Sequence, residues 1–157
     1  MAFAAGFCVN MLGVDFTIKH TTQQHSMGLQ VYDNKGRRWI YITAGGTIAV
    51  FSLVKAANAD DPYTSAVIAT ASNAATAVMG MNTLALSSGD YAWIVRAGVV
   101  EDDAVVVSSA VAAGDPIIAS SAGACTIAVE TDINNAIGIC LVDDTDNTGT
   151  VLLFGMG

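Results

Sequence analysis

The chain has 157 residues, which suits one domain with a core of useful size. Charged residues make up only 13% of it, about half of the roughly 25% that is usual for soluble domains, while hydrophobic residues make up 53%. The net charge of −8 excludes DNA and RNA as main partners, because phosphate binding needs clustered Lys and Arg.

The composition does not predict a membrane span. The longest uncharged stretch, residues 62–89, is interrupted by Ser, Thr, Asn or Gly every few residues, so it lacks the ~20 mainly apolar residues of a spanning helix. No Lys or Arg precedes the apolar residues 1–14, as it would in a secretory signal. We therefore expect a chain made in a cytoplasm that covers apolar surface by binding itself or a larger assembly.

The first residues predict a docking arm. Phe3, Phe7, Met11 and Leu12 are interleaved with Ala and Gly, which suits a segment lying along a partner better than a regular strand. We expect residues 1–14 to be this arm, within an amino-terminal region of residues 1–25 that also contains a lead-in strand at 14–19. Residues 26–157 are expected to form a single β domain.

Charge is unevenly distributed along the chain. Residues 1–58 carry five cations and two acids, a balance of +3, whereas the remainder carries one cation and twelve acids, a balance of −11. Lys19, Arg37 and Arg38 are therefore candidates, together with the arm, for contacting an acidic partner surface.

Residues 29–43 carry the clearest strand signal. Two alternating segments flank the turn sequence Asp-Asn-Lys-Gly at 33–36, which predicts a hairpin. The second strand places Arg37, Trp39 and Tyr41 on one face. Trp39 and Tyr41 have two interpretations: they pack in the core, or they form a surface for a sugar or a protein partner.

The rest of the chain predicts an all-β fold, a compact antiparallel β-barrel or β-sandwich. Runs of β-branched and aromatic residues recur about every 8–12 residues between turn-forming residues. The Ala-rich residues 56–81 have no clean period, so we expect a short helix around 65–79 or an irregular excursion. The other predicted strands cover residues 47–54, 91–96, 104–107, 117–120, 125–130, 137–142 and 150–154.

Few residues suggest chemistry. Cys8, Cys125 and Cys140 form no Cys-x-x-Cys pair, and an odd number is a poor disulfide framework, so we expect free thiols, with a Cys125–Cys140 bridge as the minor alternative. The Asp-rich residues 143–149 begin like a calcium loop, but Gly155 stands where a bidentate Glu is needed. We interpret them as a polar loop.

Catalytic and cofactor motifs are also missing from the sequence. It contains no Gly-x-Ser-x-Gly, no Walker loop and no Gly-x-Gly-x-x-Gly. His20 and His25 frame a polar stretch without nominated co-ligands, and the adjacent acids at 101–103 alternate faces in an extended chain. We expect no enzymatic activity, no metal and no cofactor.

Three segments carry a resemblance to a known family. They are the hairpin, aromatic strand and Ala-Gly segment at 28–48, the Gly-Asp-Tyr-x-Trp strand within 88–98, and the closing half with Ala-Gly-Asp-Pro-Ile at 113–117 and Ala-Ile-Gly-Ile-Cys at 136–140. Over about residues 28–154 the chain resembles capsid decoration (cement) proteins of marine and cyanobacterial tailed phages. Residues 1–25 match no pattern of that family.

The resemblance implies a homotrimer seated on the exterior of a phage capsid, where it binds the major capsid protein and has no catalytic residues. A decoration protein would stabilise the head through many weak contacts and needs no chemistry. The alternative is a carbohydrate-binding or adhesive module of a head fibre or tail, with Trp39 and Tyr41 as its sugar platform. An enzyme is the third and least favoured interpretation.

Overall fold

The computed structural model describes residues 14–69, 77–101, 105, 107, 111–120, 123–129, 133–143 and 148–155. Within these residues the named elements are β-strands and the 3-10 turn η3, and no helix is long and apolar enough to cross a membrane. The all-β prediction is confirmed. The elements are β1 (Gln30–Tyr32), β2 (Arg38–Thr43), β3 (Leu53–Ala56), β4 (Ala66–Ile68), β5 (Val78–Asn82), β6 (Tyr91–Val100), β7 (Pro116–Ala119), β8 (Cys125–Ile127), η3 (Ile133–Asn135), β9 (Gly138–Asp143) and β10 (Gly149–Phe154).

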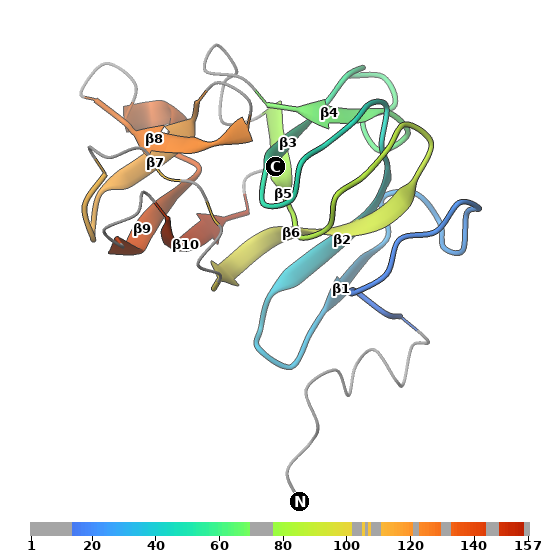
Figure 1. The fold of residues 1–157 in the computed structure, drawn as a ribbon, viewed down its shortest axis with the longest axis horizontal. Coiled ribbons are helices and arrows are strands. Elements are labelled where there is room, and N and C mark those ends of the chain that lie inside the picture. The colour runs from blue at the N-terminus through green and yellow to red at the C-terminus, as the bar shows by residue number, and fades with distance from the viewer. Residues whose placement is uncertain are drawn as a thin grey trace, which may run out of the picture.

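The strands form one curled antiparallel sheet, a half-barrel (Figure 1). Its order is β4-β3-β5-β6-β10-β9-β7-β8, with β2 paired to the other edge of β6 and β1 paired to β2. Every strand pair is antiparallel, as the alternating segments and short turns of the sequence predicted.

Strand β6 is the branch point of the sheet. Its residue Ala97 pairs with Arg38 of β2 on one side and with Phe154 of β10 on the other. Val95, two residues earlier, pairs with Met81 of β5 on the β10 side. Strands β5 and β10 therefore share one edge of β6, and the sheet divides into a β5-β3-β4 wing and a β10-β9-β7-β8 wing (Figure 1).

The β1–β2 hairpin confirms the strongest sequence prediction. Val31 pairs with Trp39, and the turn between the strands ends at Gly36, whose φ of 78° favours glycine. The predicted alternation is also observed, because Trp39 and Tyr41 belong to one buried cluster and Ile40 and Ile42 to another.

Both faces of the central strands are buried, so the fold has two cores. The larger core lies on the concave face and joins Trp39, Tyr41 and Trp93 to the apolar residues of the β10-β9-β7-β8 wing. The smaller core lies on the opposite face, where an isolated bridge between Ile48 and Leu86 helps to cover Ile94. The smaller core covers only part of that face.

Close packing at the branch point depends on Gly80 of β5. A Cβ atom added there would overlap the backbone oxygen of Val95 on β6, and the φ of 156° at this residue suits glycine. The small residue lets the two strands approach where the sheet divides.

The lead-in segment differs from the prediction. Residues 14–19 form no strand; the chain turns at Phe16 and Thr17 and makes an isolated bridge at His20 with Tyr91. Val14 and Phe16 are only 2% and 8% exposed and belong to the concave core. The predicted arm therefore cannot include Val14, and residues 1–13 lie outside the described residues.

Two other predicted segments need correction. The helix expected around 65–79 is wrong in its described part, where β4 and the start of β5 are strands, while 70–76 lie outside the described residues. The strand expected at 47–54 is interrupted at Phe51, whose φ of 54° breaks the extended chain, so β3 begins only at Leu53.

Candidate interaction surface

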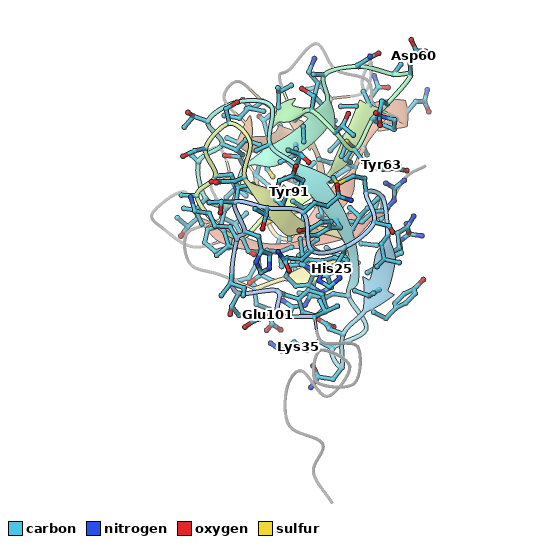
Figure 2. All side chains as sticks on the ribbon, turned by 90° about the vertical axis from the view of Figure 1, so that its right-hand side faces the viewer. His25, Lys35, Asp60, Tyr63, Tyr91 and Glu101 are labelled. Atoms are coloured by element: carbon cyan, nitrogen blue, oxygen red, sulfur yellow. The ribbon has the colours of Figure 1, made fainter. Side chains whose placement is uncertain are left out.

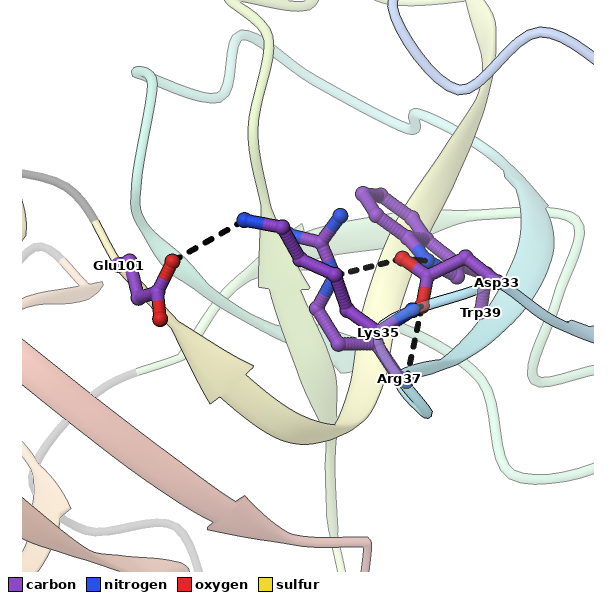
Figure 3. Close-up of polar contacts among 5 residues, drawn as sticks. All are labelled: Asp33, Lys35, Arg37, Trp39 and Glu101. Atoms are coloured by element: carbon purple, nitrogen blue, oxygen red, sulfur yellow. Dashed lines mark hydrogen bonds and ion pairs between the residues drawn. The ribbon is translucent and has the colours of Figure 1, made fainter. Parts of the chain in front are cut away.

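A buried carboxylate organises the hairpin turn. Asp33, only 7% exposed, accepts hydrogen bonds from Nε of Arg37 at 2.6 Å and from Nε1 of Trp39 at 2.9 Å (Figure 3). It also accepts from the backbone N–H groups of Lys35 and Arg37. Burial alone would raise the pKa of Asp33, but the donors from Trp39 and Arg37 outweigh it and hold the pKa below its usual range.

Two side chains, those of Phe16 and Arg37, pack on the ring of Trp39. Phe16 stacks on it with ring centroids 4.5 Å apart and an interplanar angle of 14°. The guanidinium carbon of Arg37 lies 5.0 Å from the centroid of the Trp39 ring. The lead-in segment is therefore fixed to the hairpin through one aromatic residue of β2.

The same segment covers the other aromatic rings of the concave face. His25, labelled in Figure 2, lies 5.1 Å from Tyr41 and 5.3 Å from Trp93, measured between ring centroids. Burial, and secondarily the charge of His20, lowers the pKa of His25. The aromatic cluster thus links residues 14–25 to the sheet.

This packing corrects the proposed sugar platform. Trp39 and Tyr41 are 3% and 0% exposed and belong to the concave core, so neither presents a ring face to a ligand. The core interpretation also holds for Trp93, which is fully buried.

The predicted contact residues lie in different settings. Phe3, Phe7, Met11 and Leu12 are outside the described residues. The side chain of Lys19 is 43% exposed and pairs with Asp90 at 2.7 Å. The guanidinium of Arg37 pairs with Asp33 and lies over the ring of Trp39, and the Arg37 side chain is 23% exposed.

Arg38 belongs to a different surface, which the sequence did not reveal. The register places Tyr32, Arg38, Ala97 and Phe154 opposite one another on the adjacent strands β1, β2, β6 and β10. Tyr32 is 60% exposed and Phe154 is 50% exposed. Arg38 between them donates from Nη2 to the backbone oxygen of Gly155 at 2.7 Å. We call these four residues the outer row.

The outer row continues across the β10-β9-β7-β8 wing. Val99, Leu152, Ile139 and Pro116 form a second paired row, and their neighbours on each strand point into the concave core. Leu141 and Val142 of β9 are 37% and 50% exposed. We call the whole surface the outer face: Tyr32, Arg38, Ala97, Val99, Pro116, Ile118, Ile139, Leu141, Val142, Thr150, Leu152 and Phe154.

A cavity of about 410 Å³ lies beside the β5-β3-β4 wing. Tyr63, Met79 and Arg96 are among its lining residues. Burial lowers the pKa of Arg96, Tyr63 opposes this, and the nearby charge of Arg38 adds to it. The cavity lining thus includes Arg96, which directly precedes Ala97 of the outer row on β6.

Metal ligands and thiols are the remaining candidates for chemistry in the sequence. Among them, no three His, Cys, Asp or Glu side chains converge on a possible metal position. Cys125 and Cys140 are buried and form no disulfide, as predicted, whereas Cys8 lies outside the described residues. Burial, and secondarily Cys140, raises the pKa of Cys125 to about 12.

These features define a class of protein: an all-β half-barrel whose apolar outer face is partly exposed among the described residues. No family model matches the sequence, and no curated protein matches it. A solved structure that is similar is the head fiber gp8.5 N base of bacteriophage phi29, with a TM-score of 0.54 and 12% sequence identity. The match covers 82% of this chain and 97% of that chain. At this identity the likeness establishes a shared fold.

Proposed function

We propose that this chain is a non-enzymatic structural protein of a tailed-phage virion, located on the capsid exterior, where it binds between major capsid protein subunits and stabilises the head. The observation that carries the proposal is the fold shared with a phage head fiber base over 82% of the chain. The independent sequence resemblance to capsid decoration proteins points to the same part of the virion.

The surface of the chain supports an assembly role. Charged residues are few, and the outer face exposes Tyr32, Val142 and Phe154 at 60%, 50% and 50%. Contiguous apolar surface of this kind marks interaction sites on soluble proteins. Each Å² of apolar surface covered contributes about 25 cal/mol before the costs of association, so many bound copies together stabilise a shell.

The capsid-docking end is proposed to be the amino-terminal one. Residues 1–13 contain no charged residue and include Phe3, Phe7, Met11 and Leu12. Lys19 follows them with a side chain that is 43% exposed, although its ammonium group forms an ion pair with Asp90 at 2.7 Å. Arg37 is a weaker candidate than the sequence suggested, because its guanidinium holds Asp33 and covers Trp39.

A second candidate within the same class is the base of a head fibre, which anchors further protein to the capsid. The similar solved structure is described as such a base, and this chain aligns with 97% of it. A fibre base needs capsid binding but not capsid stabilisation. The sugar-binding version of this alternative is disfavoured, because Trp39 and Tyr41 are buried.

A sedimentation experiment tests the proposal. Heads are assembled from the major capsid protein encoded in the same genome, mixed with the purified chain and pelleted. We expect saturable co-pelleting at a fixed ratio to capsid subunits, and no co-pelleting with heads of an unrelated phage. If the chain stays in the supernatant with its own heads, capsid binding is contradicted.

A further inference from the structure

We infer that copies of this chain bind one another through their outer faces. This deepens the proposed function by naming the surface through which copies associate. Self-association is tested with the purified chain alone, and capsid binding is tested with assembled heads. Either proposal can therefore be contradicted without affecting the other.

The first argument is register. The outer row joins β1, β2, β6 and β10, so Tyr32, Arg38, Ala97 and Phe154 project from the same face at successive strand spacings. Aromatic residues and Arg are the types enriched at the centres of protein interfaces. Here two exposed aromatic residues flank one Arg, which is already positioned by its bond to Gly155.

The second argument is charge. The chain carries −8, so two copies repel each other over most approaches. Among the side chains that the structure describes on the outer face, Arg38 is the charged one, Tyr32 and Thr150 carry hydroxyl groups, and the others are apolar. The outer-face residues therefore bring no acidic side chain into a contact between two acidic copies, and the apolar side chains of one outer face can pack against those of another copy.

The third argument is size. The outer face crosses six strands, or five spacings of about 4.8 Å, and extends about 15 Å along them, which gives a footprint on the order of 350 Å². That area is comparable to the largest apolar patch of a typical monomer, which is often functional. A stable interface needs about 800 Å² per partner, so the outer face would form its apolar centre within a polar rim.

The location of the smaller core explains why the outer face is left uncovered. Loop residues Ile48 and Leu86 cover the same side of the sheet over β2 and β6 near Ile94. They do not extend over Phe154 and Val142, which stay half exposed. A second copy would cover the outer face of the β10-β9-β7-β8 wing, as these loops cover the same side of β2 and β6.

The test is sedimentation equilibrium of the full-length chain over a concentration series, with Phe154→Asp and Tyr32→Asp as variants on two different strands. Ile18→Asp is the matched control, since Ile18 is 45% exposed but lies on the lead-in segment that covers the concave face. Phe7→Asp examines the amino-terminal segment. Near-UV circular dichroism verifies the fold of each variant.

We expect the wild-type chain and the Ile18 and Phe7 variants to self-associate. Each outer-row variant should raise the dissociation constant about tenfold or more, which is the effect of one buried aromatic contact. A monomeric wild-type chain would overturn the inference. So would folded outer-row variants that associate as tightly as wild type, or association that is lost with Phe7→Asp but kept with both outer-row variants.

Discussion

Asp33 and Arg37, four residues apart across the β1–β2 turn, form an ion pair of 2.6 Å, and the same carboxylate accepts the indole N–H of Trp39 at 2.9 Å (Figure 3). The pair therefore has a structural function. It fixes the hairpin turn, orients Trp39 and holds a guanidinium over its ring.

Replacing Asp33 should destabilise the fold strongly. Asp33→Ala leaves the indole N–H of Trp39 buried without its acceptor and the Arg37 charge without its partner. We expect a loss of about 2–4 kcal/mol in the free energy of unfolding, measured by urea denaturation. Asp60→Ala, at an exposed loop position, is the control and should change stability little. A loss at Asp33 no larger than in the control would show that the turn does not depend on this carboxylate.

Phe16 should behave as a core residue although it lies outside any strand. It is 8% exposed, stacks on Trp39 and contacts Trp93 edge-on at 5.7 Å between ring centroids. Phe16→Ala should lower the free energy of unfolding by about 3 kcal/mol. Ile18→Ala, two residues further on and 45% exposed, should cost much less. Equal effects of the two substitutions would contradict the observed packing of the lead-in segment.

Stability should decline on acidification in two stages. Because the pKa of folded His25 lies below 6.5, the unfolded chain binds a proton first as the pH falls below that value, so folding becomes less favourable. Asp33 and Asp90, whose pKa values are lowered from 3.8, add stability that is present above that value and lost as the pH falls through their folded pKa values. Urea midpoints measured at about pH 7 and about pH 5 isolate the first stage. His25→Phe, which keeps a ring against Tyr41 and Trp93, should reduce the difference between those midpoints. An unchanged difference would show that a group other than His25 causes the pH dependence in this range.

Removing residues 1–13 should separate folding from docking. Val14 and Phe16 are buried, and the shortened chain keeps both, so it should retain its urea midpoint. It should no longer pellet with heads, because the proposed docking segment is gone. Extending the deletion through Phe16 should destabilise the fold as well. If the chain without 1–13 still binds heads fully, the docking surface lies elsewhere.

Alternating side chains and turn sequences predicted those parts of the fold that depend on interactions between residues close in sequence. The hairpin at 29–43 has alternation, a turn sequence and a glycine at the required position, and the structure confirms all three. By contrast, β4 and β5 lie in an Ala-rich segment with little side-chain signal. Their strands exist because Val54 of β3 pairs with Ile68 on one side and with Gly80 on the other, which is a tertiary effect.

The candidate surface was even less visible in the sequence. Tyr32, Arg38, Ala97 and Phe154 are far apart along the chain, and only the placement of β10 beside β6 brings them into one row. The sequence left open a surface role for Trp39 beside Arg37 and Arg38, yet Arg37 helps to bury its ring. Residue type indicated an interaction surface, but topology determined which residues form it.

The measurement that tests the central proposal most directly is calorimetry of heads assembled from the cognate major capsid protein, with and without saturating chain. The contacts of the chain with neighbouring capsid subunits must be broken before a decorated head opens, so we predict a higher disruption temperature of the heads. The increase should saturate at the ratio of chain to capsid subunits at which co-pelleting saturates. The chain without residues 1–13 should produce no increase. An unchanged disruption temperature at full occupancy would contradict a stabilising role and favour the fibre-base alternative.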